Sequence, residues 1–263
     1  MRSIKKIIVL FMFMLVLLPA VTAQSLKGMG FNGATGLYNV PTGRIGWEKS
    51  ANLGMDLGYD GIIHSGMANI PKFNLSIIKL FEISAALDIQ SPDYSNDSWM
   101  DGLLGMKFQL PIETTAIAIG GNLQFFDPGK NRSIAGQIYA SITYPGTFFS
   151  MPAETTMMIG TTFRDGVNNT SVDFGMGFDL ILLPTVFQNF IHWVTDFSNF
   201  SYSDSPWGVD AAQRGSLNTG LRIDLSMIQG LGNFKFVVDI IAADILDSDR
   251  SFAFGAVFGI PLL

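Results

Sequence analysis

The feature of this sequence that most limits its fold is a strict alternation of apolar and polar side chains over the length of a membrane-crossing strand. Residues 171–182 show it most clearly: apolar side chains occupy every second position, and Asp173, Asp179 and two glycines lie between them. Successive side chains of an extended chain point to opposite faces, so one face of this segment is apolar and the other polar. A transmembrane β-strand needs about 9–11 residues, and this segment is long enough to be one.

The same alternation recurs between residues 50 and 263, which we expect to form one domain. The pattern predicts an all-β fold, a transmembrane antiparallel up-and-down β-barrel of about 12 strands (roughly 10 to 14). The expected strands are residues 52–60, 72–77, 81–90, 100–110, 116–125, 134–144, 155–164, 171–182, 190–202, 217–225, 234–240 and 251–262.

The connections between the expected strands also alternate in chemistry. Those after odd-numbered strands are polar, apart from the partly apolar first one at 61–69, whereas the others carry less charge and often contain proline, as at 110–112 and 145–152. Outer-membrane barrels have short periplasmic turns and longer outer loops, so this order predicts both termini in the periplasm. A soluble secreted β protein remains the alternative fold, although a soluble β-sandwich would not be expected to place polar and less charged connections in alternation.

The start of the chain has the three parts of a secretory signal peptide. Basic residues near the start precede an apolar run at 7–18, and Val21, Thr22 and Ala23 offer a small-residue cleavage site. The apolar run is shorter than the roughly 20 residues of a membrane-spanning helix. We therefore expect residues 1–23 to be a cleaved signal peptide and the mature protein to reside in the bacterial outer membrane.

Charge and cysteine content exclude several classes of function. The formal net charge is −6, and loss of the three basic residues of the signal peptide makes the mature chain more acidic still, so nucleic acid is not an expected partner. The chain has no cysteine, which excludes disulfides, a thiolate nucleophile and a cysteine metal site. We expect no metal and no cofactor.

A glycine-rich segment, residues 24–49, precedes the first expected strand. It contains Gly33-Ala34-Thr35-Gly36-Leu37-Tyr38-Asn39-Val40-Pro41-Thr42. This run resembles the Gly-x-x-Gly-Leu-x-x-x-Pro-Thr opening of YjbH-like outer-membrane barrels and of small spirochaetal outer-membrane barrels. The resemblance implies an outer-membrane barrel without naming a cargo, and the chain lacks the lipobox cysteine of the lipoprotein members. Two interpretations of 24–49 stay open, a periplasmic lead-in and a segment folded into the barrel lumen.

Most charged side chains fall on the expected inner faces, where acids outnumber bases. Such charges can pair and close a narrow lumen, or they can line a polar channel that favours cationic or neutral solutes. Both interpretations remain open. The expected lumen-lining charged residues are Asp56, Asp60, Lys72, Glu82, Asp88, Asp101, Lys107, Arg164, Asp173, Asp179, Arg222, Asp224, Lys235 and Asp239, together with Asp196.

Catalytic and metal sites are not expected. His64 and Ser65 are adjacent, so on a strand they point to opposite faces and make a poor base and nucleophile pair. His192 and Asp196 share a face but lie some 13 Å apart along a strand. Asp93 to Asp97 form a polar stretch better explained as a solvated loop.

These patterns predict a narrow outer-membrane channel for small cationic or neutral solutes, or a structural component of the envelope. A closed barrel that acts as a surface binding or adhesion module is the alternative. Expected partners are outer-membrane lipid and, during biogenesis, the barrel-assembly machinery, because Gly255, Phe258 and Ile260 resemble its terminal-strand signal. Aromatic residues near the expected strand ends, including Tyr59, Tyr144 and Tyr202, predict interfacial girdles.

Overall fold

The structure is a computed structural model of the whole chain. It describes residues 28–47, 51–64, 66–92, 98–112, 115–126, 134–164, 171–187, 189–202, 215–227, 234–247 and 250–263. The predicted signal peptide, 1–23, and the polar stretch from Asp93 to Asp97 lie outside these residues.

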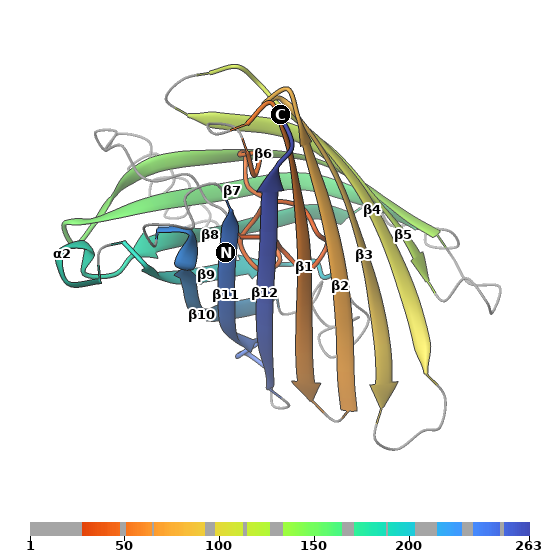
Figure 1. Cartoon of the computed structure of the whole chain (residues 1–263). Helices are drawn as coiled ribbons and strands as arrows, with labels where there is room; N and C mark the ends of the chain where they lie inside the picture. The colour runs from red at the N-terminus through yellow and green to blue at the C-terminus, as the bar shows by residue number, and fades with distance from the viewer. Residues whose placement is uncertain are drawn as a thin grey trace, which may run out of the picture.

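Twelve strands form one closed antiparallel barrel, in which each strand pairs with its neighbours in sequence and β12 pairs with β1 (Figure 1). This confirms the predicted up-and-down barrel and its strand number. The strands are β1 (Leu53–His64), β2 (Gly66–Ile77), β3 (Phe81–Pro92), β4 (Trp99–Gln109), β5 (Ala116–Phe126), β6 (Ile134–Phe148), β7 (Met151–Arg164), β8 (Ser171–Ile181), β9 (Ile191–Ser198), β10 (Ser216–Asp224), β11 (Lys235–Ala243) and β12 (Ser251–Pro261).

Two of the expected connections are mostly strand. β1 and β2 pair from Leu53 opposite Ile77 to His64 opposite Gly66, so residues 61–64 and 66–69 are strand rather than loop. The alternation continues there, since Ile62 is buried and Ile63 exposed. Residues 145–148 and 151–152 likewise belong to β6 and β7, and only Phe149 and Ser150 form the turn between them.

The alternation in sequence becomes an alternation in burial. Along β12, buried and exposed residues take turns from Ser251 to Gly259, and large apolar side chains such as Leu104, Ile138 and Phe254 are exposed on the outside. Leu180 is an exception to the predicted apolar outer face of β8. It is buried, with Ala153 and Trp193 as its neighbours in register.

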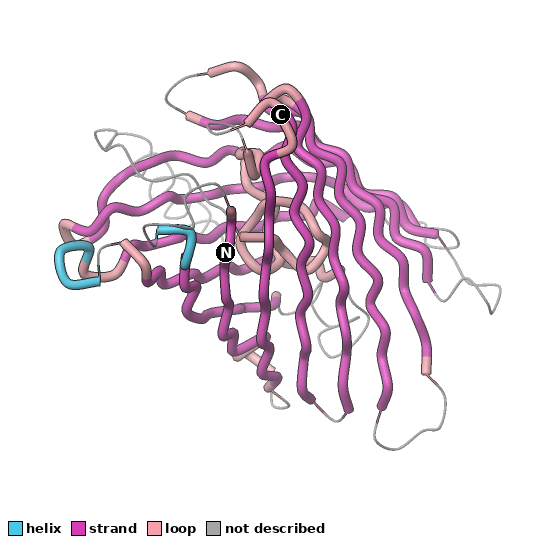
Figure 2. Tube along the Cα trace, viewed as in Figure 1, coloured by secondary structure: helices cyan, strands magenta, loops and turns pink. Residues whose placement is uncertain are grey.

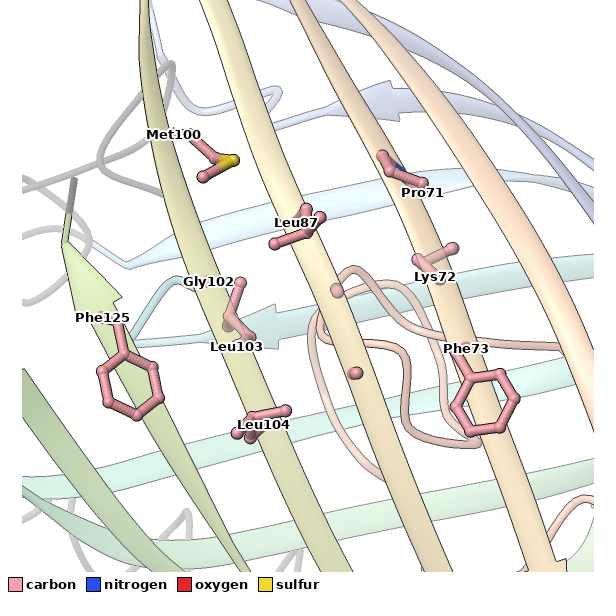
Figure 3. Close-up of a pocket in the computed structure, with 11 residues that line it drawn as sticks. Pro71, Lys72, Phe73, Leu87, Met100, Gly102, Leu103, Leu104 and Phe125 are labelled. Atoms are coloured by element: carbon pink, nitrogen blue, oxygen red, sulfur yellow. The ribbon is translucent and has the colours of Figure 1, made fainter. Parts of the chain in front are cut away.

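A shallow apolar groove marks the outer face near Gly102 (Figure 3). Gly102 pairs with Leu87 on one side and Phe125 on the other. Because glycine has no side chain, the larger residues around it, including Phe73 and Leu104, border a depression. The groove belongs to the same apolar exterior as the rest of the outer wall.

The ninth strand is shorter than predicted. β9 ends at Ser198, and the chain then turns inward, so that Phe200 and Tyr202 are buried. Tyr202 is therefore not part of an interfacial girdle. Short helices α2 (Pro184–Phe187) and η2 (Leu225–Met227) follow β8 and β10. No helix in the described part of the chain is long and apolar enough to cross a membrane.

Residues 28–47 lie inside the ring of strands, where they form a compact coil (Figures 1 and 2). We call these residues the inner segment. Every one of them is buried. The segment folds back on itself through isolated bridges between Met29 and Thr35 and between Gly36 and Pro41.

Candidate functional site

The candidate site is the barrel lumen together with the inner segment. Arg44 is the only charged residue of this segment. Two of its glycines allow close approach to the wall: a Cβ at Gly33 would lie 2.6 Å from the carbonyl oxygen of Ala85, and one at Gly43 would lie 2.2 Å from that of Ala116. Gly33 also has a φ of +81°, which side chains disfavour. The segment therefore touches the backbone of the wall itself.

Four ion pairs of lysine or arginine with a carboxylate join neighbouring or nearby strands of the wall in the described residues, and all their members are buried. A buried charge without an oppositely charged partner destabilises the fold, so each of these charges needs its partner within contact distance. The pairs are Lys72–Asp60 (2.5 Å), Lys107–Glu82 (3.0 Å), Arg222–Asp239 (2.8 Å) and Lys235–Asp56 (2.6 Å).

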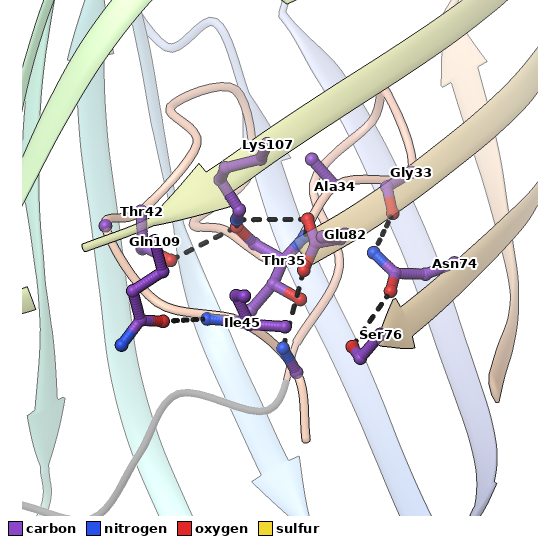
Figure 4. Close-up of polar contacts among 12 residues, drawn as sticks. Gly33, Ala34, Thr35, Thr42, Ile45, Asn74, Ser76, Glu82, Lys107 and Gln109 are labelled. Atoms are coloured by element: carbon purple, nitrogen blue, oxygen red, sulfur yellow. Dashed lines mark hydrogen bonds and ion pairs between the residues drawn. The ribbon is translucent and has the colours of Figure 1, made fainter. Parts of the chain in front are cut away.

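One of these pairs clamps the backbone of a single residue in the inner segment (Figure 4). The amide of Thr35 donates to Oε1 of Glu82 at 2.9 Å, and Nζ of Lys107 donates to the Thr35 carbonyl at 2.9 Å. The pair therefore satisfies a donor and an acceptor of the same residue. Charge-assisted hydrogen bonds of this kind are stronger than neutral ones.

The other three pairs also contact the inner segment. Lys72 donates to the carbonyl of Met29 at 3.3 Å, and Arg222 donates to the carbonyl of Gly36 at 3.1 Å. The Trp47 indole donates to Asp56 at 2.8 Å. The wall charges thus pair with one another and hold the segment at the same time.

Neutral side chains of the wall complete these contacts. Asn74 donates to the carbonyl of Gly33 at 3.1 Å, and Gln109 accepts from the amide of Ile45 at 3.0 Å (Figure 4). Thr143 accepts from the amide of Gly43 at 2.9 Å. The inner segment is therefore bound by strands on several sides of the barrel.

Asp196 on β9 holds the middle of the inner segment. Its Oδ2 accepts from the amides of Asn39 and Val40, at 2.5 and 3.0 Å. The Asn39 side chain in turn donates to Ser198 Oγ and to the carbonyl of Phe200, at 2.7 and 2.6 Å. Asn39 thus connects the inner segment to the chain that leaves β9.

The residues after β9 fill the lumen from a second direction. The hydroxyl of Tyr202 accepts from Asn122 at 3.0 Å and donates to Gln137 at 2.9 Å. Phe200 and Tyr202 pack edge to face, with 5.5 Å between ring centroids. Both belong to one apolar cluster with the inner segment's Phe31 and other residues, so the two insertions form a single packed interior.

The remaining predicted lumen residues are placed as follows. Asp88 lies opposite Asp101 in register, and both are buried. Asp173 is buried and accepts from Gln137 at 2.7 Å, and Asp224 accepts from the amide of Ser226 at 3.0 Å.

Arg164 lies on β7 opposite Ala135, and its side chain is outside the described part of the structure. The other predicted residues are buried.

Two polar pairs of the lumen are not predicted by the sequence. Arg44 pairs with Glu154 on β7 at 2.7 Å. His192 bonds through Nδ1 to Asp179 at 2.5 Å and through Nε2 to the carbonyl of Asn189 at 3.2 Å, so both ring nitrogens are engaged. These partners come from different strands or from the inner segment, and finding them requires the strand register. Within the described residues no cluster of carboxylates and histidines could hold a metal ion.

Known proteins resemble this chain in fold but not in sequence. The sequence matches no protein-family model and no curated protein, so the resemblance to YjbH-like barrels gains no support from relatives. Among solved structures, the barrel is similar to the KdgM porin, with a TM-score of 0.51 and 7% identity over 79% of this chain and 99% of that one. It is similar to the NanC porin with a TM-score of 0.52 and 8% identity over 79% and 100%. The chain therefore has the fold of bacterial outer-membrane barrels of the porin type.

Proposed function

We propose that the protein is an outer-membrane channel for small cationic or neutral solutes, closed by the inner segment and opened when that segment is displaced. The observation that carries this proposal is the polar attachment of a fully buried inner segment to the lumen wall. The segment also places Phe31, Leu37, Tyr38 and Val40 in the apolar cluster of the lumen, so displacement has to separate these side chains from the wall as well as replace polar contacts. Net hydrogen-bond energies of about 0.5–1.5 kcal/mol each allow such a segment to leave, because water can replace its partners.

The membrane location rests on the outer surface of the barrel. Large apolar side chains are exposed on the strands, and lipid is the environment that would cover them. The signal peptide at 1–23 would direct export, and the barrel-assembly machinery would insert the folded domain with both termini in the periplasm.

Selectivity for cationic or neutral solutes follows from the wall charges that displacement of the inner segment would expose. The four wall ion pairs stay neutral, because each keeps both its positive and its negative member. Asp196 and Glu82 would lose backbone donors, and Glu154 would lose Arg44, the cation of the inner segment. A vacated lumen therefore carries a surplus of negative charge, which attracts cations and repels anions.

A reversible cross-link would test the gate directly. The Cγ2 atom of Val40 lies 2.7 Å from a Cβ built on Gly175 of β8, close to the about 3 Å that separates a disulfide sulfur from the opposite Cβ. The native chain has no cysteine, so Val40→Cys/Gly175→Cys introduces the only thiols. In planar bilayers we expect discrete cation-selective steps from the reduced variant and none from the oxidised one.

Each single-cysteine variant under the same oxidant is the matched control and should conduct as the reduced double variant does. Steps of equal size and frequency before and after oxidation would show that solutes pass without movement of the inner segment. Silence in both states would favour the closed alternatives, a structural envelope component or a surface binding module.

A further inference from the structure

Apolar side chains of the inner segment pack against the lumen wall, but most of the hydrogen bonds between the two use the backbone of the segment. Carbonyl groups accept hydrogen bonds from wall donors, and amides donate to wall acceptors. The wall donors are Lys72, Asn74, Lys107 and Arg222, and the wall acceptors are Glu82, Gln109, Thr143 and Asp196.

Backbone contacts of this kind recognise peptide groups whatever the side chains are. The Glu82–Lys107 clamp illustrates this: it binds the amide and the carbonyl of Thr35 together, and every residue except proline offers the same two groups. Asp196 accepts from two successive amides, a second arrangement that fits a polypeptide chain.

The same contacts favour glycine. The backbone groups that meet the wall include the carbonyls of Gly33 and Gly36 and the amides of Gly43 and Gly46. A Cβ at Gly46 would lie 2.9 Å from Asp56 and 3.1 Å from Lys235. Larger residues at these positions would keep the backbone away from the wall side chains.

We propose that the lumen is a polypeptide-binding site that takes a glycine-rich segment of another chain, with no acidic residue and at most one cation like Arg44, in place of the inner segment. The inner segment is then a resident occupant that competes with an incoming peptide. The four wall ion pairs are internally balanced and Glu154 binds the single cation of the inner segment, so the site suits neutral peptide dipoles. It penalises an acidic peptide, whose carboxylates would have to be desolvated beside the surplus carboxylates of the wall. This inference rests on the proposed displacement of the inner segment and names a ligand class for the same lumen.

Binding of a synthetic peptide to the full-length protein in detergent tests the inference. The probe is a fluorescently labelled peptide with the sequence of residues 28–47, followed by anisotropy. We expect binding to reduced Val40→Cys/Gly175→Cys and none to the oxidised protein, whose lumen stays occupied. Gly33→Val, which weakens the inner segment and leaves the wall side chains unchanged, should bind at least about tenfold more tightly than wild type.

Two controls separate backbone recognition from unspecific adsorption. A peptide with its glycines replaced by valine should bind at least about tenfold more weakly. Lys107→Met in the Gly33→Val background should weaken binding of the original peptide to a similar degree. If Gly33→Val fails to fold, Asn39→Ala serves instead, because it removes two side-chain contacts of the segment and leaves the wall intact.

Equal binding of both peptides, or equal binding to the reduced and oxidised proteins, would overturn the inference. Bilayer recordings keep it separate from the channel. If the protein binds the peptide but never conducts, the peptide-binding site is supported and the channel proposal is wrong. If it conducts but binds no peptide, only the peptide-binding proposal is wrong.

Discussion

At the scale of single residues, Gly33 controls how closely the inner segment approaches the wall. Its φ of +81° and the 2.6 Å from a built Cβ to the Ala85 carbonyl leave no room for a side chain. A left-handed conformation alone costs an ordinary residue about 1–2 kcal/mol.

We therefore predict that Gly33→Val increases the frequency of channel openings in planar bilayers by at least about tenfold, which corresponds to about 1.4 kcal/mol. Gly136→Val is the matched control, because the nearest atom to a Cβ there is 3.6 Å away, on Leu123. Unchanged openings in Gly33→Val, with an intact barrel, would contradict a gate formed by the inner segment.

The Glu82–Lys107 pair is the second residue-scale case. Removing one member leaves a buried charge uncompensated, at a cost of about 3–5 kcal/mol, whereas replacing both with neutral residues costs less. Urea unfolding of the refolded barrel should show Lys107→Met destabilised more than the double variant Glu82→Gln/Lys107→Met. The reverse order would mean that the two charges are not coupled in the folded protein.

At the scale of elements, the β6–β7 hairpin reverses within two residues. Phe149 and Ser150 both have positive φ, 48° and 64°, while Phe148 pairs with Met151 across the turn. Positive φ at both central positions is the type I′ arrangement, which favours Asn-Gly. The turn is therefore built from residues that do not prefer its conformation.

Phe149→Asn/Ser150→Gly should raise the free energy of unfolding by about 1 kcal/mol, because the new residues tolerate this backbone at little cost. Denaturant titration would measure the change, with Ser150→Gly alone giving part of it. A decrease in stability would indicate that the exposed Phe149 ring contributes more than the turn strain costs.

At the scale of the whole molecule, an ion pair crosses the seam where the first strand, β1, pairs with the last, β12. The pair spans three strands, β1, β12 and β11. Asp56 on β1 and Lys235 on β11 are both register partners of Gly259 on β12. A Cβ at Gly259 would lie 2.0 Å from Asp56 Oδ1. The pair crosses the seam because the strand between its members has no side chain there.

Gly259→Ala should therefore lower the temperature at which the folded barrel loses its distinct gel mobility, by several degrees. Gly102→Ala is the control, since the atoms nearest to a Cβ at that position are 3.9 Å away. Equal heat stability of the two variants would show that the seam does not depend on this ion pair.

Residues of β8, β9 and β12 differ in how much of their placement the sequence predicts. The inward and outward faces of β12 could be predicted from alternation, and the structure confirms the barrel to which they belong. The prediction that Tyr202 belongs to a girdle is wrong, because the sequence gives no periodic signal for the end of β9 at Ser198. Asp179 and His192 could not be paired, since they lie on different strands and only the register brings them together.

By itself, the sequence determined the alternation of lumen-facing and outward-facing side chains along most of the strands, because the period of two is a local property of an extended chain. Only the tertiary structure decided what occupies the lumen. The inner segment is held by residues far away in the chain, such as Asp196 against Asn39 and Arg222 against Gly36. Those contacts exist only once the ring of strands has closed around the segment.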